Sequence, residues 1–365
     1  AWTLGGGLID VIVPVYAGEE ETRRCLAALH AARCQTAFEL VVVDDCSPEP
    51  ALSAWLAEQA AAGQFTLLRH ARNRGFVAAV NTGMALHPGR DVVLLNSDTE
   101  VANDWLDRIA ACAASLPRAA TITPFSNNAT VCSYPYEGWD GELPGQLGLA
   151  RLDRLFADTL ARRVVDLPTA VGFCMFIRRA CLDALGAFDE AAFGHGYGEE
   201  NDFSLRAAKA GWRNVLAADV FVYHRGAVSF GAGRFERMRQ AERTLLRRHP
   251  DYNQRVNAFI ARDPLAPLRA ANDRARVDYG IEEARQVLGE RYRERAMLKA
   301  ALRAARARAA AVHTAPPKGL RQCWREWLDQ GVARLEGSRR WGPRRRSLMQ
   351  KLLRRASTLA SGKGQ

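Results

Sequence analysis

The chain has 365 residues, 48 % of them hydrophobic, and a formal net charge of +11. This composition excludes wholesale disorder, and the length allows one large domain or two of medium size. The charge is uneven, because residues 1–233 carry 19 basic and 27 acidic side chains whereas residues 234–365 carry 32 basic and 13 acidic ones. We therefore expect an acidic globular domain over 1–233 and a basic helical region over 234–365.

Four apolar runs alternate with helical segments in the first hundred residues. We predict strands at 9–16, 38–45, 65–69 and 91–96, with helices at 19–32, 51–62 and 76–86 between them. Three of these strands are continuously apolar, which is typical of a mostly parallel sheet covered by helices on both faces. The fold class is therefore α/β, and in such sheets ligands bind beyond the carboxyl ends of the strands.

The pattern changes after about residue 100. A helix near 105–113 is followed by a loop-rich stretch from about 120 to 170, which contains a further helix near 150–163. We expect a strand at 172–178, then a helix, a loop and a helix over 179–215, and a last strand at 221–224. Beyond 234 the pattern is all-α, with helices predicted at 236–248, 280–311, 319–335 and 344–360.

Cysteine usage and hydropathy bear on the compartment. The eight cysteines form no C-x-x-C pair and no cluster, which argues against a zinc ribbon or a secreted disulfide framework. No run of 18 uncharged apolar residues occurs, so the sequence predicts no spanning helix. We expect reduced thiols in a cytoplasmic protein. The start at Ala1, with no basic n-region, is typical of a piece of a longer chain.

Acidic residues follow two of the predicted strands. Asp98 comes after the 91–96 strand, where a carboxylate can bind Mg²⁺ or Mn²⁺ or can cap the next helix. Asp44 and Asp45 end the second strand and can accept hydrogen bonds from a base or ribose, or stabilise the turn. The glycines at 5–7 precede the first strand and no G-x-x-x-x-G-K-[ST] motif occurs, so a dinucleotide or P-loop site lacks support.

Two further groups have both a structural and a chemical interpretation. Glu199, Glu200 and Asp202 open a helix, where they complement the helix dipole. Close like charges also raise one another's pKa values, which suits a general base acting on a hydroxyl. His224 ends the last strand and is either a structural residue or a metal ligand shared with Asp98.

Taken in order, these segments resemble the family 2 glycosyltransferases, whose domain has the GT-A fold with Rossmann-like nucleotide binding. The resemblance covers about residues 8–232. It rests on the segments 13–16, 43–47, 73–76, 95–99, 172–178, 198–202 and 223–224, together with Asn81, Gly83 and Arg206. Within the family, the rhamnosyltransferase-like and polysaccharide-assembly members are the most similar.

The resemblance implies an inverting transfer of a hexosyl or deoxyhexosyl group from a nucleotide-diphosphate sugar to a glycan or lipid-linked glycan, with Mn²⁺ or Mg²⁺. Asp98 and His224 would bind the metal, and Glu200 would be the catalytic base. The residues implied to hold the donor are Pro14, Tyr16, Asp44, Asp45, Asn73, Gly75, Asn81, Asn96 and Ser97. The acceptor pocket is expected at the 124–147 loop, with Tyr134, Tyr136 and Trp139, and in the helices after 234.

The sequence departs from the family pattern at two positions. Asn96 replaces the first acid of the D-x-D motif, which leaves one carboxylate for the metal and makes His224 more important. Glu200 replaces the more usual Asp, so the base could instead be Glu199 or Asp202.

The basic region and two other function classes leave alternatives open. Residues 339–355 interleave Arg and Lys with Leu and Met, which predicts a helix on an anionic membrane surface, on its inner face, or one packed on a partner protein. A nucleotidyltransferase is disfavoured because the acidic 17–21 segment would repel a triphosphate. The alternative to an enzyme is a nucleic-acid- or partner-binding protein with a degenerate nucleotide-sugar domain. The few aromatic residues of the tail argue against nucleic acid.

Overall fold

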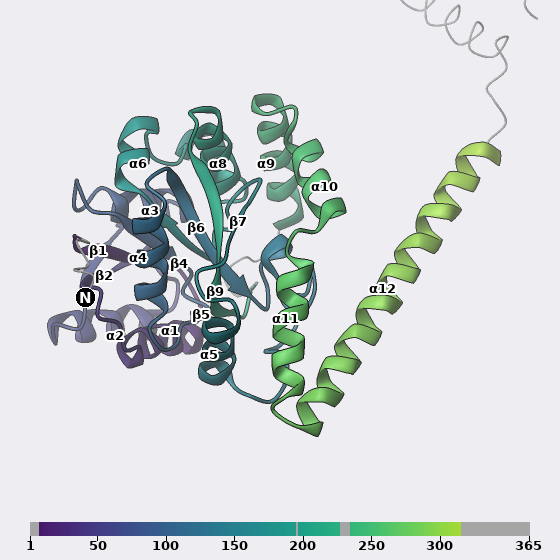
Figure 1. The fold of residues 1–365 in the computed structure, drawn as a ribbon. Coiled ribbons are helices and arrows are strands. Elements are labelled where there is room, and N and C mark those ends of the chain that lie inside the picture. The colour runs from purple at the N-terminus through teal and green to yellow at the C-terminus, as the bar shows by residue number, and fades with distance from the viewer. Residues whose placement is uncertain (1–6, 195, 227–233, 315–365) are drawn as a thin grey trace, which may run out of the picture. The chain divides into compact units, whose positions relative to one another are not determined.

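The computed structural model describes residues 7–194, 196–226 and 234–314. The chain divides into two compact units, residues 1–292 and 293–365. The first unit holds an α/β body with helices around a sheet (Figure 1). The helices predicted at 319–335 and 344–360, and the basic segment 339–355, lie outside the described residues.

A sheet of nine strands runs through the first unit in the order β3-β2-β1-β4-β8-β6-β9-β5, with β7 beside β9. The strands are β1 Ile9–Val15, β2 Phe38–Asp44, β3 Thr66–Arg69, β4 Val92–Leu95, β5 Thr99–Glu100, β6 Ala119–Ser126, β7 Val164–Asp166, β8 Cys174–Ile177 and β9 Arg213–His224. The first four strands pair in parallel, as the sequence predicts. β8 runs antiparallel between β4 and β6, so the sheet as a whole is mixed.

Helices cover both faces of this sheet. The helices of the described residues are α1 Glu19–Ala31, α2 Pro50–Ala61, α3 Phe76–Met84, α4 Trp105–Ser115, α5 Leu149–Thr159, α6 Arg179–Leu185, α7 Glu190–Phe193, α8 Glu199–Lys209, α9 Arg234–Arg248, α10 Tyr252–Arg262, α11 Ala266–Val277 and α12 Ile281–Thr314, with a 3₁₀ turn at Thr130–Cys132. Because strand side chains alternate, Val11 and Val13 pack with α1, α2, α4 and α5, and Ile12 packs on the other face with α3, α6 and α8.

The loop-rich interpretation of residues 120–170 is wrong for β6, whose eight residues are all buried. Threonines interrupt the apolar pattern of this strand and hide it from a periodicity argument. Thr121 Oγ1 donates to Asn214 Oδ1 at 2.9 Å, and Thr123 Oγ1 accepts from the backbone N–H of Val171 at 3.3 Å. A buried hydroxyl that has a hydrogen-bond partner costs little folding free energy, so polar residues are tolerated inside the sheet. β9 likewise begins at Arg213, well before the predicted 221–224 strand.

The helices after residue 233 pack on the α/β body. Ala241 and Leu245 of α9 belong to one apolar core. Phe259 of α10, Leu268 of α11 and Leu265, which lies between these two helices, belong to the other. The first compact unit includes α9, α10, α11 and the start of α12, and it ends at Tyr292. The domain boundary expected at 233/234 stays a prediction. Within the described ranges, no helix combines the length and hydrophobicity needed to cross a bilayer.

Candidate active site

Asp98 and His224 meet where β5 pairs with the end of β9. Asp98 lies in the turn between β4 and β5, and the β5–β9 register places Thr99 opposite His224. His224 Nε2 is 3.5 Å from Asp98 Oδ1. The other carboxylate oxygen, Oδ2, accepts from the backbone N–H of Gly226 at 3.0 Å. The structure thus brings the two predicted metal ligands together from distant parts of the chain.

Hydrogen bonds fix the orientation of the His224 ring. Nδ1 lies 2.7 Å from the backbone oxygen of Asn128, which can only accept, so Nδ1 carries the proton. The other ring nitrogen, Nε2, faces the carboxylate of Asp98. The Asn127 side chain holds the main chain of His224. Its Oδ1 accepts from His224 N at 2.8 Å, and its Nδ2 donates to His224 O at 2.9 Å. An imidazole held by a backbone carbonyl and facing a carboxylate is a donor set that fits Mn²⁺.

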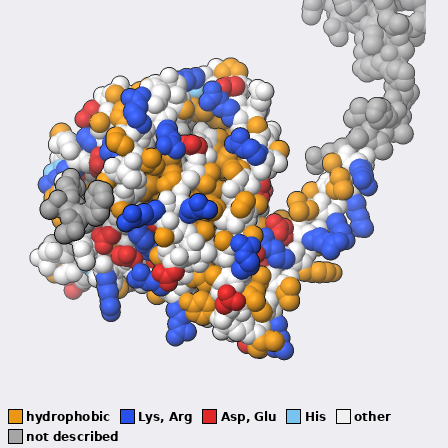
Figure 2. Space-filling model, viewed as in Figure 1, with side chains coloured by type: hydrophobic (Ala, Val, Ile, Leu, Met, Phe, Trp, Pro, Cys, Tyr) orange, Lys and Arg blue, Asp and Glu red, His pale blue; other side chains and the backbone are white. Residues whose placement is uncertain are grey.

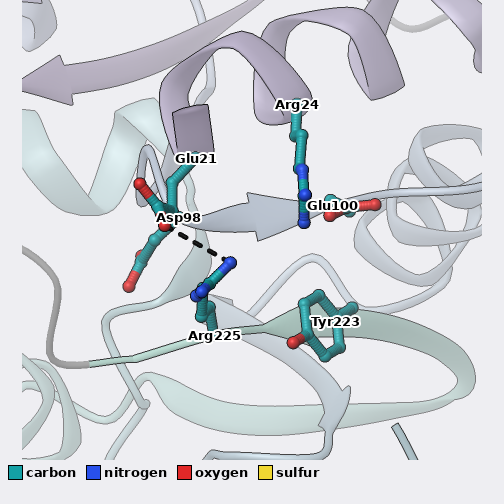
Figure 3. A pocket seen from close by; sticks show the side chains of 6 residues that line it. All are labelled: Glu21, Arg24, Asp98, Glu100, Tyr223 and Arg225. Atoms are coloured by element: carbon teal, nitrogen blue, oxygen red, sulfur yellow. Dashed lines mark ion pairs between the residues drawn. The ribbon is translucent and has the colours of Figure 1, made fainter. Parts of the chain in front are cut away.

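A small hollow adjoins Asp98 (Figure 3). Its lining residues are Glu21, Arg24, Asp98, Glu100, Tyr223 and Arg225. Arg225 Nη1 is 3.3 Å from Glu21 Oε1, and the Arg225 side chain is 46 % exposed. The sequence interpretation assigned no role to Arg225. Its position directly after His224 was the available signal.

Two adjacent carboxyl groups stand at the N-terminus of α8. Glu199 is 5 % exposed, and burial together with the neighbouring Glu200 carboxylate raises the pKa of Glu199 well above its ordinary value. Burial also raises the pKa of Glu200, whose oxygens accept from Gly198 N at 3.2 Å and Asn201 Nδ2 at 2.9 Å. A pair of close carboxyls in which one retains its proton provides a proton acceptor that works near neutral pH.

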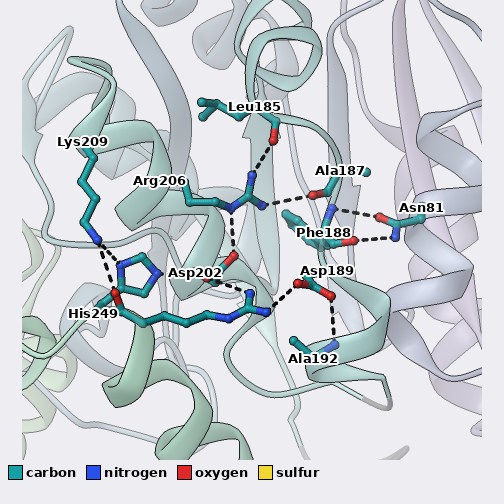
Figure 4. A network of polar contacts seen from close by, with 11 residues as sticks. Asn81, Leu185, Ala187, Phe188, Asp189, Ala192, Asp202, Arg206, Lys209 and His249 are labelled. Atoms are coloured by element: carbon teal, nitrogen blue, oxygen red, sulfur yellow. Dashed lines mark hydrogen bonds and ion pairs between the residues drawn. The ribbon is translucent and has the colours of Figure 1, made fainter.

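Asp202, the third acidic residue of α8, forms ion pairs with neighbouring side chains. Its Oδ2 accepts from Arg206 Nε at 2.8 Å, and its Oδ1 lies 2.9 Å from His249 Nε2 (Figure 4). Burial acts to raise the pKa of Asp202, but the hydrogen bonds from His249 and Arg206 outweigh it, so the pKa is lowered. The carboxylate therefore joins α8 to the end of α9, and its geometry favours Glu200 over Asp202 as the base.

A short segment before β8 touches both halves of the site. The ring of Phe173 stacks on His224 with centroids 5.2 Å apart, and Phe173 O accepts from Asn96 N at 2.9 Å. Gly172 lies beside Glu200, because a Cβ at this position would be 3.7 Å from Glu200 Cγ. The Asp98–His224 pair and the Glu199–Glu200 pair are therefore neighbours across this segment.

Asp44 and Asp45 are both buried at the end of β2. Asp44 accepts from Ser47 N at 2.9 Å through Oδ1 and from Ser53 Oγ at 2.8 Å through Oδ2. Asp45 Oδ2 accepts from Gly75 N at 2.7 Å, so this carboxylate caps α3. Both carboxylates stabilise the loops at the carboxyl edge, and their direct contact with a base or ribose stays a prediction.

The other predicted donor residues differ in how they are placed. Pro14 is buried within β1, Tyr16 is half-buried just beyond it, and Asn73 is exposed. Asn81 is used internally, since its Nδ2 donates to Phe188 O at 2.9 Å and its Oδ1 accepts from Phe188 N at 3.2 Å. This amide braces the loop before α7 against α3. Gly75, Asn96 and Ser97 lie in the turns that precede α3 and follow β4, with Ser97 6 % exposed.

The expected acceptor loop is more buried than its composition suggests. Tyr134 is fully buried and its ring meets Phe156 edge-on at 5.1 Å. Tyr136 is 4 % exposed. The expectation that these two tyrosines line an open acceptor pocket is therefore wrong, because both belong to the interior. Trp139 is half-exposed.

A second group of possible metal ligands, formed by Asp10, Glu39 and His87, lies at the opposite edge of the sheet. Asp10 and Glu39 are at the starts of β1 and β2. Arg90 Nη1 contacts Asp10 Oδ1 at 2.9 Å and Glu39 Oε2 at 2.7 Å. The guanidinium already supplies the positive charge there, so we assign this cluster a structural role.

Comparison with known proteins identifies the family that this chain resembles. Residues 10–186 match the family model described as glycosyl transferase family 2. The uncharacterized protein y4gI of Sinorhizobium fredii is 26 % identical over 272 residues, 70 % of this chain and 28 % of that protein. Glycosyltransferase AglE of Haloferax volcanii is 23 % identical over 217 residues, 59 % of this chain and 66 % of that protein. This chain thus spans less than two thirds of either relative.

Among solved structures, the crystal structure of GalNAc-T7 with UDP, GalNAc and Mn²⁺ superposes with a TM-score of 0.52 at 16 % identity. The superposition covers 73 % of this chain and 54 % of that one. At this level of identity, the likeness supports a shared GT-A-type fold.

Proposed function

Because residues 10–186 belong to glycosyl transferase family 2, we propose that the chain transfers a sugar from a nucleotide-diphosphate sugar to an acceptor hydroxyl, with inversion at the anomeric carbon. The observation that carries this proposal is the pairing of Asp98 with His224 beside the Glu199–Glu200 carboxyl pair. The sugar is a hexosyl or deoxyhexosyl group, as in the rhamnosyltransferase-like branch.

Asp98 and His224 would hold a divalent cation, Mn²⁺ or Mg²⁺, under the donor diphosphate. His224 Nε2 and Asp98 Oδ1 face each other at 3.5 Å, and an imidazole nitrogen and a carboxylate oxygen are both ligands that such a cation accepts. A bound Mn²⁺ would offset the negative charge that develops on the leaving nucleoside diphosphate. GalNAc-T7 was crystallised with UDP and Mn²⁺. Asn96 stands where a second acid would stand, so His224 supplies the second ligand.

Glu200 would take the proton from the acceptor hydroxyl as that oxygen attacks the anomeric carbon. Its raised pKa matches a group that must accept a proton near neutral pH. Attack from the face opposite the leaving group inverts the configuration and needs no covalent enzyme intermediate. Pro14, Tyr16, Asp45 and the 73–83 segment would hold the donor.

The acceptor would be a glycan or a lipid-linked glycan. With a lipid-linked acceptor, the basic residues of 339–365 would serve to bring the enzyme to an anionic membrane surface. Flotation with anionic liposomes tests this, comparing the chain with and without residues 339–365. Equal flotation of both chains would contradict a role for the tail.

A nucleotide-sugar screen tests the proposed function. The full chain is incubated with Mn²⁺ and each of a panel of nucleotide sugars, and thermal shift and nucleoside diphosphate release are measured. We expect at least one donor to stabilise the protein and to be turned over only with the divalent cation. A chain that no donor stabilises, but that binds mixed RNA or DNA in a salt-dependent manner, would favour the binding-protein alternative.

A further inference from the structure

Tyr252, the first residue of α10, lies at the end of a hydrogen-bond chain that leads to Glu200. Tyr252 Oη donates to Asn201 Oδ1 at 3.3 Å. Asn201 Nδ2 in turn donates to Glu200 Oε1 at 2.9 Å. This hydrogen-bond chain runs from α10, one of the helices after residue 233, to α8, which carries the candidate base.

The network shown in Figure 4 holds the turn that precedes Tyr252. His249 Nε2 is 2.9 Å from Asp202 Oδ1, and Lys209 Nζ is 2.9 Å from His249 Nδ1. Tyr252 N donates to His249 O at 3.0 Å, so the tyrosine directly follows this clamped turn. Arg248 adds an ion pair to Asp189 at 2.7 Å. The start of α10 is therefore held firmly against α8.

The orientation of the Asn201 amide depends on the Tyr252 hydroxyl. A side-chain amide can present either its oxygen or its NH₂ group to a neighbour. The ionised Glu200 carboxylate can only accept, so it faces Nδ2, and the Tyr252 hydroxyl, by donating to Oδ1, holds the amide in that orientation. An N–H donor favours the ionised carboxylate and holds its side chain in one rotamer.

The charged groups around this hydrogen-bond chain determine which of its members stay protonated. Burial, Glu200 and Glu242 raise the pKa of Tyr252 to about 12, so the phenol keeps its proton over the working pH range. Glu199 faces Glu200 from the same helix, and its raised pKa makes it the member of the pair that retains a proton. The Asn201 amide counteracts part of the cost of ionising Glu200 beside these groups.

We propose that Tyr252 is a positioning residue for Glu200, acting through the amide of Asn201 to fix the carboxylate that receives the acceptor proton. This inference rests on the proposed role of Glu200 as the base. It places a residue from the helical region after 233 in the working parts of the enzyme.

Tyr252→Phe tests the inference in the full chain, because it removes only the hydroxyl and keeps the buried ring. We expect kcat to fall about three- to tenfold, as for one lost hydrogen bond. The KM for the donor and the Mn²⁺ requirement should not change. The acidic limb of the pH profile of kcat should move to higher pH, because Glu200 loses a donor that favours its ionised form.

Asn201→Ala is the second variant and should cause the same changes to a larger extent. Because both residues act in one chain, the double variant should be no slower than Asn201→Ala alone. Tyr279→Phe, in which a 54 % exposed tyrosine loses its hydroxyl, is the matched control and should behave like the wild type. An unchanged kcat and pH limb in Tyr252→Phe, or fully additive effects in the double variant, would overturn the inference.

The Glu200→Gln variant separates this inference from the proposed function. If Glu200→Gln retains full turnover, Glu200 is not the base and both proposals fail. If Glu200→Gln is inactive while Tyr252→Phe matches the wild type in rate and pH profile, only the role of Tyr252 fails.

Discussion

At the scale of single residues, two asparagines determine what His224 can do. The backbone oxygen of Asn128 accepts a hydrogen bond from Nδ1, and the Asn127 side chain bonds to both the N–H and the C=O of His224. Such partners fix the tautomer and the ring orientation of an imidazole that binds a metal. The sequence could identify His224 as a candidate because it ends a strand, but the asparagine contacts depend on packing between segments nearly a hundred residues apart.

The Asp98→Ala variant should weaken donor binding in the presence of Mn²⁺ by at least about tenfold, since it removes the carboxylate that pairs with His224 in the proposed metal site. Calorimetry with the donor identified in the screen measures this affinity. Asp158→Ala, at an exposed position of α5, is the control and should bind like the wild type. Unchanged affinity in Asp98→Ala would rule out this residue as a metal ligand.

Glu199→Gln should stabilise the protein at neutral pH. A carboxyl whose pKa is raised on folding stabilises the folded state fully only below its unfolded pKa of about 4.3, and this stability is lost as the pH rises through the folded value. Glutamine has no such proton to lose. Its Tm should therefore exceed that of the wild type at pH 7.5 and approach it at pH 4.

The matched control for this measurement is Glu58→Gln, at an exposed position of α2, which should show no pH-dependent change in Tm relative to the wild type. A Glu199→Gln protein that is less stable than the wild type at pH 7.5 would mean that Glu199 is ionised and paired in the folded state.

At the scale of elements, a buried ion network joins α11 and α12 to the loop after β6. Arg276 is completely buried, with Nη1 2.7 Å from Glu290 Oε2 and Nε 3.0 Å from Glu283 Oε2. The same guanidinium donates to Tyr134 Oη at 3.1 Å, and Tyr134 donates to Asp273 at 2.8 Å. The network therefore orders the loop that contains Tyr134, the residue expected from sequence in an acceptor pocket.

The Arg276→Met variant should lose roughly 3–5 kcal/mol of unfolding free energy, because two buried carboxylates lose their partner. Urea unfolding at pH 7 measures the loss. Arg285→Met removes an exposed pair with Glu282 and should have little effect. Equal stability of the two variants would show that Arg276 is not paired as described.

The elements that could be predicted from sequence are those in which one physical signal dominates. The runs of β1, β2 and β4 are apolar enough to identify buried strands, and the parallel pairing of the first four strands follows from the helices between them. β6 was missed because Thr121, Thr123 and Pro124 break its apolar pattern. α10 and α11 were missed too, since their buried positions are few and their partners lie elsewhere in the chain.

At the scale of the whole molecule, the net charge of +11 describes neither half of the chain. The acidic part contains the carboxylates of the candidate site, and basic residues concentrate after 233. Along α12, basic and hydrophobic side chains lie side by side (Figure 2). Leu288, Tyr292 and Leu298 are all more than half exposed there. The high pI of the protein therefore says little about the substrate of the site.

The site itself could be predicted in part. Asp98, His224, Glu199 and Glu200 were identified because acids and a histidine stand at the ends of predicted elements, and the structure places them together. The internal partners of Asp45, Asn81 and Asp202 could not be predicted. Those contacts depend on how loops and helices pack, which no local pattern of the sequence reports.

The role of Glu200 as the base is tested most directly by measuring donor binding and turnover of Glu200→Gln, with Mn²⁺ and the donor identified in the screen. The amide keeps the size of the side chain but cannot take the acceptor proton. We predict that donor affinity stays within about twofold of the wild type while transfer falls by at least about a hundredfold, which is the range of general-base contributions. Turnover of Glu200→Gln at the wild-type rate would show that Glu200 is not the base.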